Sequence, residues 1–200
     1  IFRATAPSAP ANAPVPVGRR RRVLWLVTIG FALSGFALSA MLAQMVPMLT
    51  QLGLGASALV ISTMFGPAQV LVRLVNMLVG ARRHPLAAPL IALAMTPLAI
   101  AILTLSAPWA VGAALFAVLL GFGSGLKSIV QGTLPLALFG SASYGARLGV
   151  MAAVRQGLAA VAPFALAFLI GSLGAGIALW LIALVGLAGL LCLIGVAILS

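Results

Sequence analysis

The sequence predicts an all-α membrane protein with six transmembrane helices. Three observations lead to this prediction: 64% of the 200 residues are hydrophobic, only 6% are charged, and Asp and Glu are absent. A soluble domain carries roughly 25% charged residues, so this chain cannot cover a surface that faces water. Its apolar runs are also long enough to cross a hydrocarbon core, which takes roughly 20 helical residues.

The first 22 residues are expected to form a cytoplasmic, disordered basic linker before a six-span domain over residues 23–200. Residues 1–18 are rich in proline and alanine, a composition typical of extended or disordered segments. Four arginines, Arg19 to Arg22, then mark the boundary of the first membrane helix. The chain begins with Ile1 and this stretch lacks a signal-peptide core, so we expect a further N-terminal portion.

The first three predicted spans cover residues 23–49, 56–79 and 86–105. Trp25, near the start of the first span, fits the aromatic belt at the membrane interface. The dipeptide Gly66-Pro67 predicts a kink in the second span, because proline removes a backbone donor and clashes with the preceding turn.

The last three predicted spans cover residues 109–131, 145–170 and 177–199. The fourth begins with Trp109, which again suits the interface. A longer connection over residues 132–144 is expected to separate the fourth span from the fifth. The sixth span is the most apolar and is expected to face lipid or to support the bundle.

The positions of arginine and lysine predict that both ends of the chain lie in the cytoplasm. With Arg19 to Arg22 placed inside, the loop Gly80 to Pro85 also falls inside, and the three outside turns contain no Lys or Arg. Cytoplasmic loops carry an excess of these residues. We therefore expect a multi-pass protein of the cell (inner) membrane, surrounded by membrane lipids. Because the cations lie mostly at the ends of apolar runs, nucleic acid is not expected as a partner.

Polar side chains form a stripe along one face of three of the predicted spans. Residues spaced by i, i+3, i+4 and i+7 share a helix face. Such stripes should face a water-filled cavity, because lipid would leave their polar groups unsatisfied. The candidate substrate-binding or cavity-lining residues, including polar residues near the stripes, are Gln44, Gln69, Arg73, Asn76, Lys127, Gln131, Arg155 and Gln156.

The three cations among these candidates are predicted to lie at different depths. At 1.5 Å per residue, Lys127 lies roughly 7 Å, Arg73 roughly 9 Å and Arg155 roughly 15 Å from the cytoplasmic ends of their predicted spans. The first two are shallow enough to extend their side chains to the headgroups. Arg155 lies close to the midplane of a 30 Å core. We therefore expect Arg155 at the central site and Lys127 near its inner mouth.

Two pairs of glycines have the GxxxG spacing that lets membrane helices approach closely. They are Gly121 with Gly125, and Gly145 with Gly149, and we expect both pairs to serve helix packing. The chain contains no GxSxG, HExxH or CxxC motif, and His84 is its only histidine. Neither an enzyme activity nor a metal or other cofactor is therefore expected.

Six spans, two cytoplasmic ends, a basic linker and the loop sequence GARRHP together resemble the C-terminal half of a major facilitator superfamily transporter. The loop is similar to the degenerate copy of the family's basic loop motif, and the resemblance implies a cytoplasmic gate at Arg82 and Arg83. The usual Asp of that motif is absent, and Gly80 and Ala81 stand in its place. The stretch SGLKSIVQGTLPLALFG is also similar to bacterial members of the family. The resemblance covers residues 19–200.

This resemblance implies a twelve-helix bundle of two six-helix halves around a central cavity, so an N-terminal six-helix half is expected as a partner. It also implies a secondary active transporter that works by alternating access. Positive cavity walls favour a small anionic or zwitterionic solute. One alternative is a multidrug or toxic-compound exporter of the same fold, and another is a non-catalytic membrane anchor or scaffold subunit. A proton carrier of the Asp or Glu type would have to come from the other half.

Overall fold

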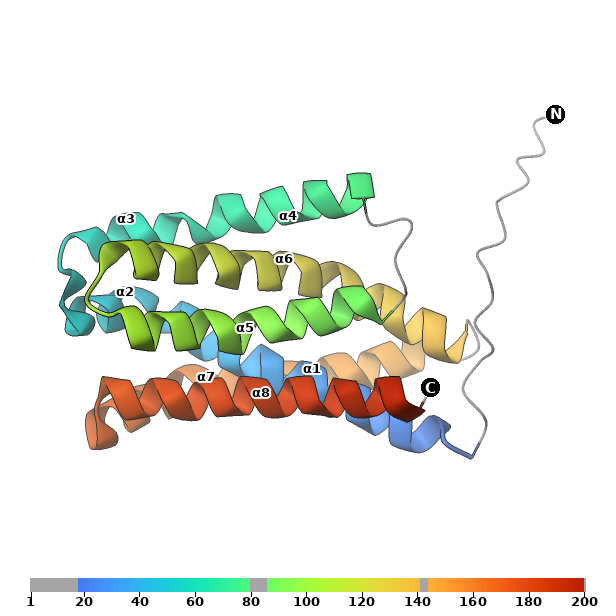
Figure 1. The fold of residues 1–200 in the computed structure, drawn as a ribbon. Helices are drawn as coiled ribbons and strands as arrows, with labels where there is room; N and C mark the ends of the chain where they lie inside the picture. Colours follow the sequence, from blue (N-terminus) through green and yellow to red (C-terminus); the bar gives the residue numbers. More distant parts are fainter. Residues whose placement is uncertain (1–17, 80–85, 141–143, 200) are drawn as a thin grey trace.

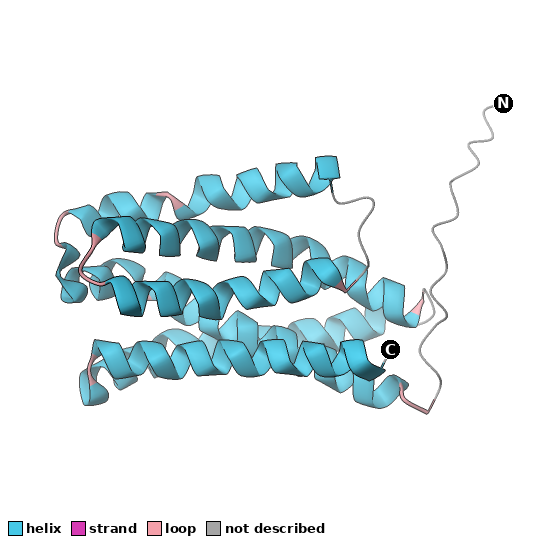
Figure 2. Ribbon diagram, viewed as in Figure 1, coloured by secondary structure: helices cyan, strands magenta, loops and turns pink. Residues whose placement is uncertain are grey.

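The computed structural model describes residues 18–79, 86–140 and 144–199, which form a bundle of long helices (Figure 1). These ranges contain helices and loops and no strand, as Figure 2 shows. Within them, six helices are long and apolar enough to cross a membrane. By length and composition the chain is therefore a multi-span membrane protein, as the sequence predicts.

Each of the first two spans is divided into two helices near a proline. The proline lies four residues after the last residue of the first helix. Helix α1 (Arg20–Ala43) is followed by α2 (Met45–Leu49) and the turn η1 (Thr50–Leu54), in which Gly53 has a positive φ of 89°. The second span consists of α3 (Ser57–Thr63) and α4 (Phe65–Val79). The ring of a proline clashes with the carbonyl group four residues earlier in a continuous helix. Pro47 and Pro67 therefore account for the ends of α1 and α3. The second span is interrupted at Met64, close to the predicted kink at Gly66-Pro67. The first span, predicted over residues 23–49, is interrupted after Ala43, which the sequence analysis did not predict.

The remaining spans are α5 (Ala87–Ser106), α6 (Ala110–Phe139), α7 (Tyr144–Leu173) and α8 (Ala175–Leu199). The sequence predicted a connection from residue 132, but α6 continues through Pro135 to Phe139. It ends at Gly140, whose φ of 71° lies in the left-handed region that favours glycine. This extension changes the depth of every polar residue on α6.

The helices run side by side, so the bundle has two ends (Figure 1). We call one of them the basic end, because Arg19 to Arg22 and Arg147 lie there. At the basic end α1 and α7 begin, and α4, α6 and α8 finish. The opposite end, where α1 leads into α2 and α7 turns into α8, is called the neutral end.

The packing of the six spans repeats after three helices. Helix α1 packs against α7 and α8, and α6 packs in the corresponding way against α4 and α5, while α5 and α8 pack against each other. If α1, α4 and α5 are exchanged with α6, α7 and α8 in that order, each of these contacts is replaced by another contact of the same set. Helices α1 and α6 are the most buried spans, whereas α4 and α7 are mostly exposed.

Gly121 and Gly125 allow α6 to approach the backbone of α4. A Cβ atom added to Gly121 would lie 2.5 Å from the carbonyl oxygen of Phe65, and one added to Gly125 would lie 2.5 Å from that of Gln69. The packing role predicted for this pair is confirmed. An added Cβ on Gly145 or Gly149 meets nothing within 4 Å in the described part of the chain, so a packing role for them has no support there.

Replacing Gly125 by leucine is expected to force α4 away from α6 and to destabilise the protein. Overpacking of a close contact typically costs about 1–3 kcal/mol, so a fall of several degrees in melting temperature in detergent is expected. The control is Gly176→Leu on α8, where an added Cβ has open space. Equal melting temperatures for the two variants would contradict the close contact between α4 and α6.

Candidate functional site

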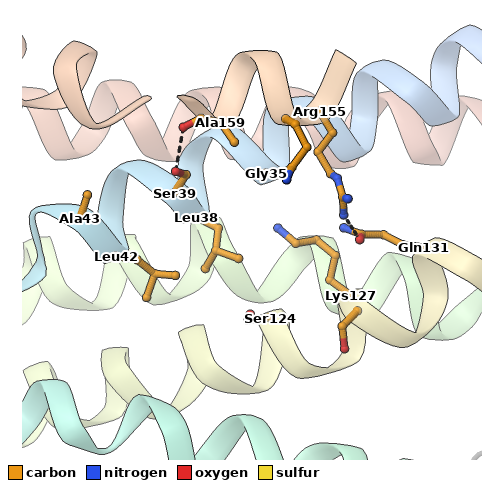
Figure 3. Close-up of a pocket in the computed structure, with 12 residues that line it drawn as sticks. Gly35, Leu38, Ser39, Leu42, Ala43, Ser124, Lys127, Gln131, Arg155 and Ala159 are labelled. Atoms are coloured by element: carbon orange, nitrogen blue, oxygen red, sulfur yellow. Dashed lines mark hydrogen bonds between the residues drawn. The ribbon is translucent and has the colours of Figure 1, made fainter. Parts of the chain in front are cut away.

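A cavity of about 570 Å³, which we call the central cavity, lies between α1, α6 and α7. The small residues of α1, the polar residues of α6 and Arg155 of α7 face one another across it (Figure 3). Its lining consists of Gly35, Leu38, Ser39, Leu42, Ala43, Ser124, Lys127, Ser128, Gln131, Arg155, Gln156 and Ala159.

Lys127 is buried in the middle of the bundle, with only 4% of its surface exposed. Its Nζ donates hydrogen bonds to the carbonyl oxygen of Ser34 at 3.1 Å and to the hydroxyl oxygen of the same residue at 3.3 Å. Because α6 continues to Phe139, the lysine lies roughly 18 Å from the basic end of its helix. The predicted shallow position of Lys127 is therefore wrong, and its side chain bonds across to α1 instead of extending to the headgroups.

Arg155 lies at a similar depth on α7, roughly 17 Å from Tyr144 at the start of the helix. Its guanidinium group donates a hydrogen bond to the side-chain oxygen of Gln131 on α6. Gly35 on α1 provides the space for this side chain, because an added Cβ would lie 3.1 Å from Cγ of Arg155. A guanidinium has five N–H donors, so donors remain for a further acceptor in the cavity.

These two cations face one cavity without an acidic partner. The chain contains no Asp or Glu, and the partners found for Lys127 and Arg155 among the described residues are a carbonyl group, a hydroxyl group and an amide. A buried charge is costly unless it is paired and hydrogen-bonded. The central cavity therefore has a positive wall that suits an anionic ligand.

The lining of the central cavity changes from polar to apolar along the bundle. Lys127, Gln131 and Arg155 gather at one end of the cavity, and Leu42 and Ala43 lie toward the neutral end (Figure 3). Both α6 and α7 carry their polar lining residues at mid-depth, whereas α1 carries apolar residues along its last turns. A ligand in this cavity would therefore meet charge at one end only.

A second cavity of about 270 Å³ lies on the basic-end side of the first. Gln131 and Arg155 line both cavities, so the hydrogen bond between them stands at the boundary. The other lining residues of the second cavity are mostly apolar: Phe31, Gly132, Leu148, Met151 and Ala152.

Four of the eight predicted cavity residues do line the central cavity, namely Lys127, Gln131, Arg155 and Gln156. They come from α6 and α7, which the hydrogen bond from Arg155 to Gln131 joins at this point. The structure thus brings the predicted residues of α6 and α7 together.

The other predicted residues lie elsewhere. Gln69 donates a hydrogen bond from Nε2 to the hydroxyl oxygen of Ser124 at 2.8 Å, which joins α4 to α6 beside the cavity. Arg73 is exposed and Asn76 is half-buried on α4, away from the cavity lining. Gln44 is half-buried at the break after α1, directly after the lining residue Ala43. The predicted gate residues Arg82 and Arg83 lie outside the described residues.

Sequence reasoning missed the contribution of α1, which supplies Ser34, Gly35 and Ser39. Ser39 donates its hydroxyl proton to the carbonyl oxygen of Ala159 at 2.8 Å and so ties α1 to α7. Small residues in the middle of an apolar run are typical of contacts between membrane helices. The Ser34-Gly35 pair was therefore the available signal that other helices cross α1 at this point.

The described part of the chain brings no three His, Cys, Asp or Glu side chains together as a metal site would require. No protein-family model, curated protein or solved structure matches this chain. The central cavity offers two cationic groups, on Lys127 and Arg155, to which an anion could bind.

Proposed function

We propose that this chain is the C-terminal half of a secondary active transporter that moves a small anionic or zwitterionic solute by alternating access. The observation that carries the proposal is the pair Lys127 and Arg155. These cations lie at mid-depth in an apolar bundle, line one cavity and have no acidic residue in the chain to pair with. Intramembrane ionisable residues of this kind mark substrate or ion pathways.

The packing pattern supports a bundle of the major facilitator type. Three spans are an odd number, so the second set of three runs through the membrane in the direction opposite to the first. The contacts of α1 with α7 and α8 correspond to those of α6 with α4 and α5, which is the relation expected of an inverted repeat. Each six-helix half of these transporters is built from such a three-plus-three repeat.

Polar residues on the exposed helices support a partner of six further helices. Arg73 on α4 and Gln156 on α7 are exposed, and each lies well inside an apolar span. Lipid would leave such groups unsatisfied. We therefore infer that another protein segment, the N-terminal half of the transporter, covers this face and closes the central cavity.

The distribution of arginine supports an orientation with the basic end in the cytoplasm. Arg19 to Arg22 and Arg147 lie at the basic end, and positive charge next to membrane helices favours the cytoplasmic side. On this orientation the apolar part of the central cavity points outward, and the second cavity lies toward the cytoplasm. The cell (inner) membrane is the proposed location.

The test is solute uptake by the intact protein in proteoliposomes. Labelled organic anions, amino acids and cationic dyes are offered in parallel, with protein-free liposomes as the control. We expect saturable uptake of at least one anion or zwitterion and none of the cationic dyes. Transport of cationic dyes alone would contradict the proposal and favour a multidrug exporter. The transporter would also be excluded if the proposed partner segment proved to be a catalytic domain and not six further spans.

A further inference from the structure

We infer that the ligand of the central cavity is an amphipathic organic monoanion. Its single carboxylate-type group lies between Lys127 and Arg155, and its apolar body extends along α1 toward the neutral end. This inference rests on the proposed transport function and narrows the class of solute that the cavity takes.

The polar end of the cavity is built for one anionic group. Lys127 and Gln131 are one helical turn apart on the same face of α6, and Gln131 bonds to Arg155. The ammonium and guanidinium groups therefore lie on neighbouring walls of one region. An anion placed there accepts charge-assisted hydrogen bonds from both, which are stronger than the bonds of neutral groups. A second anionic group on the ligand would have to find another cation.

No second cation lines the cavity toward the neutral end. Leu38, Leu42, Ala43 and Ala159 line that part. Two hydroxyl groups accompany them: that of Ser39 donates its proton to the carbonyl oxygen of Ala159, and that of Ser124, one turn from Lys127, accepts a hydrogen bond from Gln69. Apolar ligand surface that displaces water from such a lining is favoured. A charged ligand tail would lose its hydration there and would meet only neutral groups of this chain.

The size of the cavity argues against a small inorganic anion. Its volume of about 570 Å³ falls within the roughly 300–1,000 Å³ typical of sites for organic ligands. A phosphate or chloride ion would occupy only the polar end and would leave the leucine-lined part without a partner. An organic acid with an apolar body fills both parts.

Three carboxylates separate these possibilities. Hexanoate carries one carboxylate and an alkyl chain, adipate has the same chain length with a carboxylate at each end, and acetate lacks the chain. Binding of each radiolabelled acid to the intact protein in proteoliposomes is measured by equilibrium dialysis, with protein-free liposomes subtracted. We expect hexanoate to bind at least tenfold more tightly than acetate and adipate.

A matched pair of variants tests the position of the alkyl chain. Leu42→Asn places an amide at the apolar end of the cavity, whereas Leu105→Asn makes the same change at an exposed position on α5 outside the cavity lining. We expect the first to weaken hexanoate binding about tenfold with acetate binding unchanged, and the second to change neither. A loss of hexanoate binding in both variants alike would overturn the proposed orientation.

The outcomes for this inference and for the transport function differ. Adipate or acetate binding as tightly as hexanoate would overturn the monoanion class and leave anion transport in place. If none of the three acids binds, the inference is overturned, and the uptake panel decides separately whether other anions or zwitterions are transported. The inference is supported if hexanoate binds tightly and if Leu42→Asn weakens this binding while Leu105→Asn does not.

Discussion

Replacement of Arg155 by glutamine is expected to reduce anion uptake by the intact protein between about tenfold and 100-fold. Hydrogen bonds to charged groups contribute about 1.5–3 kcal/mol each, and every 1.4 kcal/mol is a factor of ten in affinity. Glutamine keeps a polar side chain at the position but removes the charge and most of the donors. The loss should appear mainly as a higher solute concentration for half-maximal uptake.

Arg22→Gln is the matched control for Arg155→Gln. Both variants remove one guanidinium from a long apolar helix, but Arg22 is exposed at the start of α1 and lies off the lining of the central cavity. Its uptake kinetics are expected to stay within about twofold of the wild type. Arg155→Lys should be intermediate, because lysine keeps the charge but lacks the planar fork that binds a carboxylate through two bonds. Unchanged uptake in Arg155→Gln would refute the proposed role of the central cavity.

Much of the fold could be predicted because composition and span length determine it. The six apolar helices follow from the lengths of the apolar runs, and the break in the second span lies close to the predicted kink at Gly66-Pro67. The end of α1 at Ala43 falls inside the predicted span over residues 23–49. The end of α6 could not be placed, because Pro135 is tolerated inside this helix and the helix stops only at Gly140. Proline and glycine both weaken a helix, and packing decides which of them ends it.

The candidate site could be predicted only in part, for a related reason. Helical spacing correctly groups Lys127 with Gln131, because both lie on one helix. It cannot say which helix faces another, so Gln69 and Arg73 on α4 were given the same role as Arg155. The partner of Lys127 is a backbone carbonyl group of Ser34 on a distant helix, and every residue has such a group. Only the fold identifies which one the lysine meets.

Gln131→Glu is expected to abolish anion uptake while making the protein more stable. The new carboxylate would lie beside the guanidinium of Arg155, which already bonds to this side chain, and one turn from Lys127. It would thus supply within the chain the negative charge that the solute otherwise brings. An ion pair in this surrounding is expected to raise the melting temperature in detergent by roughly 3–6 °C and to lower uptake by about 100-fold or more.

The variant Gln131→Met separates this charge effect from the loss of a hydrogen bond. Methionine has a similar length and no acceptor of comparable strength, so it frees Arg155 without neutralising it. Uptake is expected to persist with a changed maximal rate, because the contact at the boundary between the two cavities is lost while both cations remain. If Gln131→Glu transports anions as well as Gln131→Met does, the charge of Arg155 is not what holds the solute. A more stable Gln131→Glu variant with normal uptake would lead to the same conclusion. The bond between Arg155 and Gln131 would then serve only to hold α6 and α7 together.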